Sequence, residues 1–289
     1  MDETTHRKPI GTVSAIWRYP IKSMRGERIE EAQIGERGLA GDRAWALREI
    51  ATRQIASAKK FSGLFEFRAS YDSAPALSSE DEASVAPVTV ELPDGRKIHA
   101  SDDDASEAIS AALGRKMQLE RVLSAPVERA GIDPATVFAG IPAASLIGKL
   151  ASPILPDSFA LRRGTFFDSA VVHVIAAGTL KHLVKLAPGS NFDPRRFRAN
   201  ILVDTGERDD AFIEDEWLEG TLEVGSDVKI VAMKPALRCV MTTHPQEDLP
   251  RDYTILRTAA FHHRANVGVF ASIGAGGIVR AGDPVVLVR

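Results

Sequence analysis

The chain contains a single cysteine, Cys239, in the segment 237–244. A lone cysteine is most often a small buried hydrophobic residue. Here Arg238 is adjacent and His244 follows five residues later, and positive charge near a thiol lowers its pKa and favours the thiolate. A thiolate can act as a nucleophile or bind a soft metal ion. The segment is therefore a candidate for covalent, redox or metal chemistry.

Three short segments in the N-terminal half place cationic side chains at turns. Lys22 and Ser23 follow the end of an expected strand, Arg43 follows Asp42 after a glycine, and residues 57–60 combine a serine with two lysines. The ordinary interpretation is solvated charge, with Asp42 in a surface ion pair that contributes little to stability. The functional interpretation is that a strand-end lysine and serine hold an anionic group.

Residues 193–200 place three arginines within four positions, directly before an apolar strand. In an extended chain, Arg196 and Arg198 lie on the same side and Phe197 lies opposite. The planar guanidinium group matches phosphate or carboxylate. Asn200 shares the arginine side and offers both a donor and an acceptor. The segment therefore predicts an anion-binding edge.

The elements that must position these residues are mostly strands, which predicts a mainly β (α+β) fold. Strands are expected at 10–18, 43–47, 88–92, 96–99, 118–123, 171–175, 201–204, 221–224, 228–232, 267–272 and 285–288. Helices are expected at 104–113, at 179–186 and after Pro250. The glycine-rich residues 274–277 precede a strand-like run rather than a helix, which predicts a hairpin turn and not a dinucleotide-binding loop.

The composition divides the chain into two β units joined by a connector. Residues 125–156 are rich in alanine, proline and glycine and lack clear periodicity, and residues 72–87 have the composition of a long surface loop. We therefore expect an N-terminal β domain at 9–124, a connecting segment at 125–156 and a C-terminal β domain at 157–289.

Composition and charge exclude several classes of protein. With one cysteine, the chain cannot form an internal disulfide or a cysteine-rich zinc or iron–sulfur site. The net charge of −3 argues against a protein that binds the phosphates of nucleic acid over a large surface. Residues 1–8 lack the apolar core of a signal peptide, and the longest weakly polar stretch is too short for a membrane span. We therefore expect a soluble, cytoplasmic protein.

Taken in order, these motifs resemble the MOSC-domain proteins that carry an N-terminal MOSC β-barrel domain. The family includes the mitochondrial amidoxime-reducing component and its bacterial relatives. The resemblance is carried by residues 19–23, 41–43, 197–200, 238–243 and 280–285. It implies an N-terminal β-barrel-like domain and a C-terminal MOSC β-barrel domain with a few short helices.

The resemblance also implies that the chain binds the molybdenum cofactor, a phosphorylated pterin with a dithiolene. Cys239 matches the family cysteine that ligates molybdenum. The residues expected to contact the cofactor are Lys22, Ser23, Arg43, Ser57, Lys59, Asp168, Ser169, Arg198, Asn200 and Arg238. Binding of pyridoxal phosphate is not expected.

The implied activity is the reduction of N-hydroxylated or similar N-oxygenated small molecules by a molybdenum-dependent oxidoreductase. No flavin or haem motif is evident, and one cysteine cannot hold an iron–sulfur cluster. Electrons are therefore expected from a separate flavin, haem or iron–sulfur protein. Two alternatives stay open: a cofactor-binding or sulfur-carrier protein with a persulfide on Cys239, and a protein that keeps the fold without the cofactor.

Overall fold

The computed structural model describes residues 6–77, 86–121 and 166–289 of the chain. The expected connector at 125–156 and the expected domain start at 157 lie outside these residues. The described part is mostly strands, as predicted. Its four α-helices and three 3₁₀ helices are α1 (Ala105–Leu113), α4 (Ala177–Leu186), α5 (Pro194–Phe197), α6 (Thr254–His263), η1 (Ser62–Glu66), η2 (Ile213–Trp217) and η3 (Val240–Thr243).

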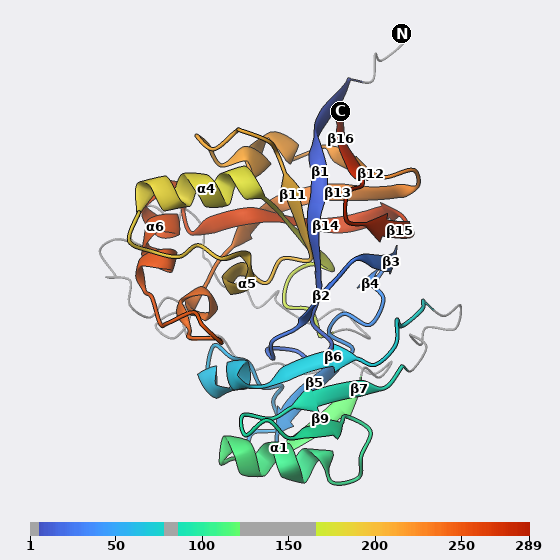
Figure 1. Ribbon diagram of the computed structural model, residues 1–289, viewed down its shortest axis with the longest axis vertical. Helices are drawn as coiled ribbons and strands as arrows, with labels where there is room; N and C mark the ends of the chain where they lie inside the picture. Colours follow the sequence, from blue (N-terminus) through green and yellow to red (C-terminus); the bar gives the residue numbers. More distant parts are fainter. Residues whose placement is uncertain (1–5, 78–85, 122–165) are drawn as a thin grey trace.

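A closed barrel of seven strands forms the upper part of Figure 1. Its strands, in spatial order, are β11 (Ile201–Asp204), β10 (Val172–Ala176), β14 (Asn266–Ala275), β13 (Val228–Leu237), β12 (Thr221–Val224), β16 (Pro284–Val288) and β1 (Arg7–Arg18). Pairing of β1 with β11 closes the ring, and β2 (Glu27–Ile29) adds to the far end of β1. Val174, Ile201 and Ile230 are among the apolar side chains that fill the interior.

Two smaller sheets and helix α1 form the lower part of Figure 1. One sheet pairs β5 (Trp45–Glu49) with β9 (Met117–Arg121), and the other contains β6 (Arg68–Tyr71), β7 (Val88–Glu91) and β8 (Lys97–His99). Leu47, Phe65, Phe67 and Ile109 belong to a separate core between them. The apolar face of α1 is buried in this core, as its sequence pattern predicts.

A third small sheet corrects one prediction. It contains β15 (Gly277–Arg280), β3 (Glu31–Gly35) and β4 (Gly38–Leu39). The glycine-rich residues 274–277 therefore do not form a hairpin turn, because β14 pairs with β13 whereas β15 pairs with β3. They connect the barrel to a strand from the N-terminal part of the chain.

Strand β1 links the N-terminal part of the chain to the barrel. Its first half pairs with β16 and its second half with β11, so residues 7–18 are a barrel strand. The division at 9–124 and 157–289 stays a prediction, and the strand pairing does not follow it at β1. No helix among the described residues has the length and apolar character needed to cross a membrane.

A buried carboxyl group lies where η2 meets the start of α4. Glu214 is 2% exposed, and its Oε1 accepts a hydrogen bond from the Ala176 amide at 2.8 Å. Its Oε2 is hydrogen-bonded to the Thr179 hydroxyl, which also accepts from the Ile213 amide at 3.0 Å. Burial raises the pKa of Glu214 from 4.5 to about 7, against the opposing effect of these hydrogen bonds.

This carboxyl group makes the stability of the protein depend on pH. The folded state binds the proton more tightly than the unfolded chain, so the free energy of unfolding decreases as the pH rises from 4.5 to about 7. The total decrease is on the order of 3 kcal/mol. Glu214→Gln keeps both hydrogen bonds without the charge and should remove this decrease. Urea unfolding of both proteins at about pH 5 and about pH 8 measures it, and equal pH dependence would contradict the assignment.

Candidate functional site

The carboxylate of Asp42 is buried where three segments of the chain meet. Its side chain has no exposed surface, and it forms an ion pair with Arg43. Its Oδ1 accepts a hydrogen bond from the Tyr19 amide at 2.7 Å, and its Oδ2 accepts from Asn200 Nδ2 at 2.8 Å. Asp42 therefore does not form the surface ion pair of the ordinary interpretation, because the fold packs strand β1 and the segment before β11 against this turn.

Backbone hydrogen bonds join the turn after β1 to the start of β5. The Arg43 amide donates to the Tyr19 carbonyl at 2.8 Å, and the Trp45 amide donates to the Pro20 carbonyl at 3.1 Å. The Lys22 amide then donates to the Trp45 carbonyl at 2.8 Å. These bonds bring the motif of Lys22 and the motif of Arg43 together, although about 20 residues separate the two along the chain.

The arginine-rich segment is not extended, which corrects the prediction for residues 193–200. Asp193 caps a short helix, α5, by accepting from the Arg195 amide at 2.8 Å, and Pro194 occupies the first helical position. Arg198 follows with a left-handed φ of 55°. Arg196 and Arg198 therefore do not share one side of a strand, and each arginine has a different environment.

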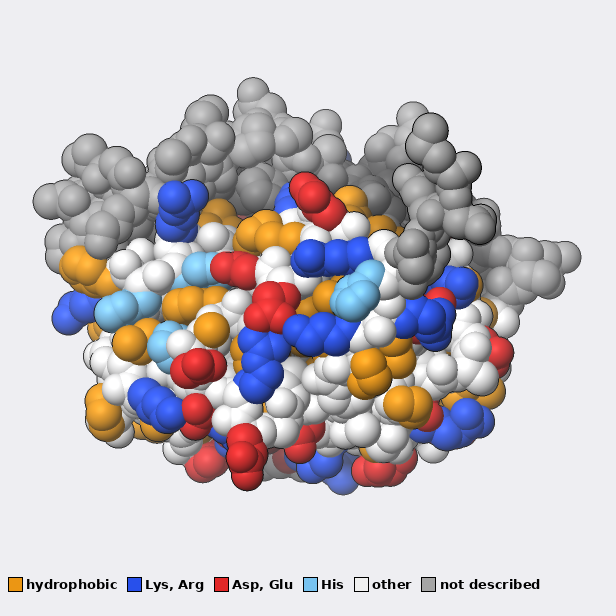
Figure 2. All heavy atoms as spheres, turned by 90° about the horizontal axis from the view of Figure 1, so that it is seen from above, with side chains coloured by type: hydrophobic (Ala, Val, Ile, Leu, Met, Phe, Trp, Pro, Cys, Tyr) orange, Lys and Arg blue, Asp and Glu red, His pale blue; other side chains and the backbone are white. Residues whose placement is uncertain are grey.

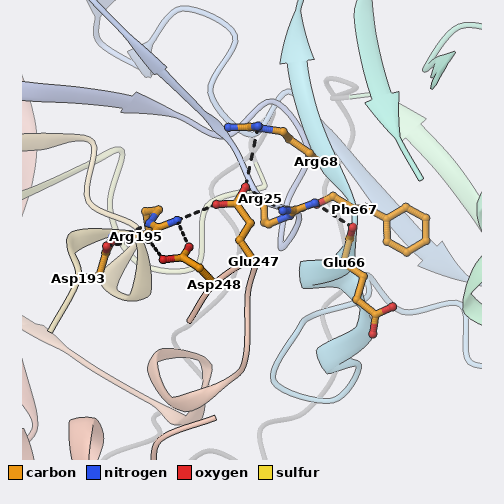
Figure 3. Close-up of polar contacts among 8 residues, drawn as sticks. All are labelled: Arg25, Glu66, Phe67, Arg68, Asp193, Arg195, Glu247 and Asp248. Atoms are coloured by element: carbon orange, nitrogen blue, oxygen red, sulfur yellow. Dashed lines mark hydrogen bonds and ion pairs between the residues drawn. The ribbon is translucent and has the colours of Figure 1, made fainter. Parts of the chain in front are cut away.

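Arg195 and Arg196 bind the segment of the chain that follows Cys239. Arg195 forms ion pairs with Asp193, Glu247 and Asp248, and Figure 3 shows how these carboxylates surround its guanidinium. Arg25 reaches the same Glu247 carboxylate at 2.8 Å from the N-terminal part of the chain.

Arg196 is 1% exposed and binds backbone oxygens only among the contacts described. It donates to the carbonyls of Asn191, Thr242, His244 and Pro250 at 2.9, 3.4, 3.4 and 2.8 Å. Three of these carbonyls follow Cys239 in the chain, that of Thr242 in η3 and those of His244 and Pro250 after it. Arg195 and Arg196 are therefore structural supports, and Arg198 is the arginine of this segment that joins the candidate site.

Arg198 and Arg43 lie over the same aromatic ring. Their guanidinium carbons are 4.1 and 4.7 Å from the centre of the Tyr19 ring. Arg198 Nη1 donates to the Met24 carbonyl at 2.6 Å, whereas its buried Nη2 has no hydrogen-bond partner in the described part of the chain. Burial, reinforced by the charge of Arg43, lowers the pKa of Arg198 to about 10. A buried guanidinium donor is thus available to a ligand.

Lys22 and Lys59 share the carboxylate of Asp168. Lys22 Nζ lies 2.7 Å from Asp168 Oδ1 and also donates to the Phe166 carbonyl at 2.7 Å, and Lys59 Nζ lies 3.1 Å from Asp168 Oδ2. Burial lowers the pKa of Lys22 to about 8, although Asp168 opposes this shift. Asp168 thus places a counter-ion between two of the cations expected to hold a ligand.

The three serines and the one asparagine of the expected set differ in their surroundings. Ser23 is buried with a left-handed φ of 68°, directly beside Lys22. Ser57 Oγ accepts from the Lys59 amide at 3.3 Å, and Ser169 is half-buried next to Asp168. Asn200 is buried and bound to Asp42, so its contribution is to hold the turn that carries Arg43.

Cys239 is partly exposed and directly precedes η3. The neighbouring Arg238 is half-buried, donates to the Phe197 carbonyl at 2.9 Å and lies over the Phe270 ring at 5.2 Å. Burial lowers the pKa of Arg238 to about 10, whereas the nearby Cys239 raises it and Arg43 lowers it further. Arg238 Nε is buried without a hydrogen-bond partner among the residues described.

His244 does not add positive charge to this thiol, contrary to the prediction. Burial and the charge of Arg251 lower the pKa of His244 to about 4, so the ring is neutral at neutral pH. Its side chain faces Phe65 and Arg251. Arg238 is therefore the cationic residue adjacent to Cys239.

The site carries an excess of positive charge within the described residues. Five cationic side chains, Lys22, Arg43, Lys59, Arg198 and Arg238, accompany the two carboxylates Asp42 and Asp168. The charge of Arg43 lowers the pKa of Lys22, Arg198 and Arg238, so these cationic groups are close enough to influence one another. Such a site favours an anionic ligand with several acceptor atoms.

The described residues contain no cluster of side chains that resembles a protein metal site. No group of three or more histidine, cysteine, aspartate or glutamate side chains in the described ranges could hold a metal ion.

On the barrel end of the molecule, seen from above in Figure 2, acidic and basic side chains are intermixed rather than separated by sign.

Sequence reasoning missed Asp42, Tyr19 and His173 as members of this site. The first two lie within motifs that the sequence singled out, where only the neighbouring cations were chosen. His173 had a different signal, since it is a polar residue in the otherwise apolar strand β10. A histidine that interrupts a buried strand needs partners for both ring nitrogens.

We predict that Asp42→Asn destabilises the protein by about 3–5 kcal/mol, because it leaves the Arg43 charge without its carboxylate and turns an amide donor toward other donors. Asp94→Asn is the matched control, since Asp94 is exposed and pairs only with Arg96 among the contacts described. The control should leave stability nearly unchanged, because an exposed ion pair contributes little. Urea unfolding measures both, and a similar small loss in each variant would contradict the importance of Asp42.

Two family descriptions match the chain. Residues 10–118 match the MOSC N-terminal beta barrel domain, and residues 162–286 match the MOSC domain. No curated protein matches the chain.

Several solved structures are similar to the chain. The YUAD protein from Bacillus subtilis is 8% identical with a TM-score of 0.46, over 99% of this chain and 98% of that one. YiiM from Geobacillus stearothermophilus is 19% identical with a TM-score of 0.30, over 42% and 55% of the two chains. A hypothetical protein is 16% identical with a TM-score of 0.32, over 43% and 54%.

Proposed function

The chain belongs to the MOSC-domain proteins with an N-terminal MOSC β-barrel domain, and from this premise we propose that it is a molybdenum-cofactor-dependent reductase. MOSC domains are associated with proteins that bind the molybdenum cofactor. The proposed substrates are N-hydroxylated or other N-oxygenated small molecules. The observation that supports the proposal is that Arg43 and Arg198 lie over the same Tyr19 ring, whereas Arg238, which adjoins Cys239, donates to the carbonyl of the residue before Arg198.

The residues present fit this cofactor. A phosphorylated pterin with a dithiolene is anionic and rich in hydrogen-bond acceptors, whereas the site has excess cationic donors. Arg198 Nη2 and Arg238 Nε are buried and unpartnered among the described residues, and buried donors normally have partners. We propose that Lys22, Ser23, Arg43, Arg198 and Arg238 hold the pterin and its phosphate, with Ser57, Lys59, Asp168 and Ser169 at its border.

Cys239 is the proposed protein ligand of the metal. A cysteine thiolate suits a soft or high-valent metal ion. When bound, the cofactor supplies a two-electron redox centre that can remove an oxygen atom from a substrate. Asp42 and Asn200 hold Arg43 in place beside it, and the partial exposure of Cys239 gives a small molecule access.

The proposed reaction needs an external source of electrons. Conversion of an N–OH group to N–H and water consumes two electrons and two protons. The single cysteine cannot hold an iron–sulfur cluster, so a separate flavin, haem or iron–sulfur protein is the proposed donor.

Turnover tests the proposal directly. Protein purified from a host that makes the molybdenum cofactor should reduce members of a panel of amidoximes, N-hydroxylated bases and S-oxides with a chemical electron donor. Cys239→Ser should reduce turnover to the background rate, because it removes the metal ligand. Arg198→Gln should lower turnover strongly, whereas Arg96→Gln, at an exposed arginine, is the matched control. Cofactor-loaded protein without turnover on the whole panel would contradict the proposal.

The alternative function is that of a sulfur carrier, and the partial exposure of Cys239 beside Arg238 favours it. An accessible thiolate can hold a persulfide. Intact-mass spectrometry should then show one added sulfur atom on Cys239 that a reductant removes and that Cys239→Ser lacks. Unmodified wild-type protein with stoichiometric molybdenum would count against this alternative.

A further inference from the structure

A second cavity lies between the end of β1, the start of β6 and helix α5. Its volume is about 290 Å³, including the solvent space at its mouth, and its lining includes Trp17, Arg68, Arg195 and Gln246. The lining contains none of the residues proposed to contact the molybdenum cofactor. Tyr19 belongs to both sites, so the cavity is a neighbour of the candidate cofactor site and not a part of it.

Arginines from three segments of the chain surround one carboxylate in this cavity. Figure 3 shows the arrangement, in which Arg25 Nη1 lies 2.8 Å from Glu247 Oε1 and Arg195 Nη1 lies 2.7 Å from Glu247 Oε2. Arg68 Nη1 is 3.9 Å from Oε1, which is too far for a hydrogen bond. The Arg68 side chain is 45% exposed, and this long ion pair is its described side-chain contact. Its guanidinium donors are therefore available to a ligand.

The charges of the lining are not balanced. Three arginines line the cavity with a single carboxylate, that of Glu247. Arg195 has two further carboxylates, Asp193 and Asp248, which lie outside the lining. Arg25 and Arg68 share Glu247 with Arg195, which leaves positive charge in excess on their side of the cavity.

Two buried donors in the lining have no partner among the described residues. Gln246 is 7% exposed, and its side-chain Nε2 is buried without a hydrogen-bond partner. The indole Nε1 of Trp17 is in the same situation. Buried polar groups normally have partners, and both of these groups can only donate. The cavity therefore lacks an acceptor.

We propose that this cavity binds a small tetrahedral oxyanion, of the class of a phosphate group. Guanidinium, indole and amide donors on different segments suit the four oxygens of a phosphate better than the two of a carboxylate, and arginine is well matched to phosphate. Arg68, Trp17 and Gln246 donate to the anion, and Arg25 adds its charge. The Glu247 carboxylate competes with the anion for these arginines. The inference goes beyond the proposed reductase function and does not rest on it.

The indole of Trp17 permits a direct test in the full-length protein. The chain has three tryptophans, so a ¹H–¹⁵N spectrum contains three indole signals, and Trp17→Phe assigns the one that matters. Inorganic phosphate, titrated at constant ionic strength against chloride, should move the Trp17 signal saturably and thereby give a Kd. Arg68→Gln should raise this Kd about tenfold, since it removes a charged donor. Glu247→Gln should lower it, because the competing charge is gone.

Two controls separate this cavity from other cationic positions. Arg96→Gln removes an arginine that pairs only with Asp94 among the contacts described, and it should leave the Kd unchanged. Lys59→Gln removes a cation at the border of the proposed cofactor site and should also leave it unchanged.

Four results would overturn the proposal. They are a Trp17 signal that phosphate does not move, a Kd unaffected by Arg68→Gln, a Kd that Glu247→Gln leaves unchanged or raises, and a response that Lys59→Gln abolishes. The last result would place the anion in the candidate cofactor site instead. The titration needs no molybdenum, so it can succeed even if reductase activity fails, and it can fail while that activity stands.

Discussion

The carboxylate of Asp42 is the contact on which the arrangement of the site depends. It accepts from the backbone after β1 and from the side chain of Asn200 before β11, and it pairs with Arg43. A buried carboxylate is tolerated only when its partners are all in place, so the three segments must close around it together. The positions of Lys22, Arg43 and Arg198 follow from that closure, because each lies within a few residues of a partner of Asp42.

Several residues of the site have a positive φ angle, which is unusual for residues other than glycine. Ser23, Arg43 and Arg198 all have left-handed φ angles, of 68°, 50° and 55°, although none is a glycine. Residues in this conformation persist where the surrounding structure determines them, and they occur frequently at functional sites. The closed barrel supplies that support, since β1, β10 and β11 are neighbours in it and carry the segments that end at the site. A rigid barrel thus supports a cluster of strained, cationic turns.

Local patterns in the sequence predicted the elements better than their pairings. The helices α1, α4 and α6 and most barrel strands follow from periodicity, and the cationic motifs could be chosen by residue type. The closure of the barrel by β1 and β11, and the pairing of β15 with β3, join residues far apart in the sequence, so no local signal reports them. Helix α5 was predictable, because Asp193 and Pro194 form a helix start, but the alternation of arginines was given more weight. The burial of Asp42 depends on Asn200, which is 158 residues away.

The central claim is that this cationic cluster and Cys239 together hold a molybdenum pterin. The most direct measurement is the molybdenum and pterin content of wild type, Cys239→Ser and Arg198→Gln from a host that makes the cofactor. Wild type should carry both in stoichiometric amounts, Cys239→Ser should lose most of its molybdenum, and Arg198→Gln should lose pterin and molybdenum together. Wild-type protein with neither component, or Cys239→Ser with the molybdenum content of wild type, would contradict the account.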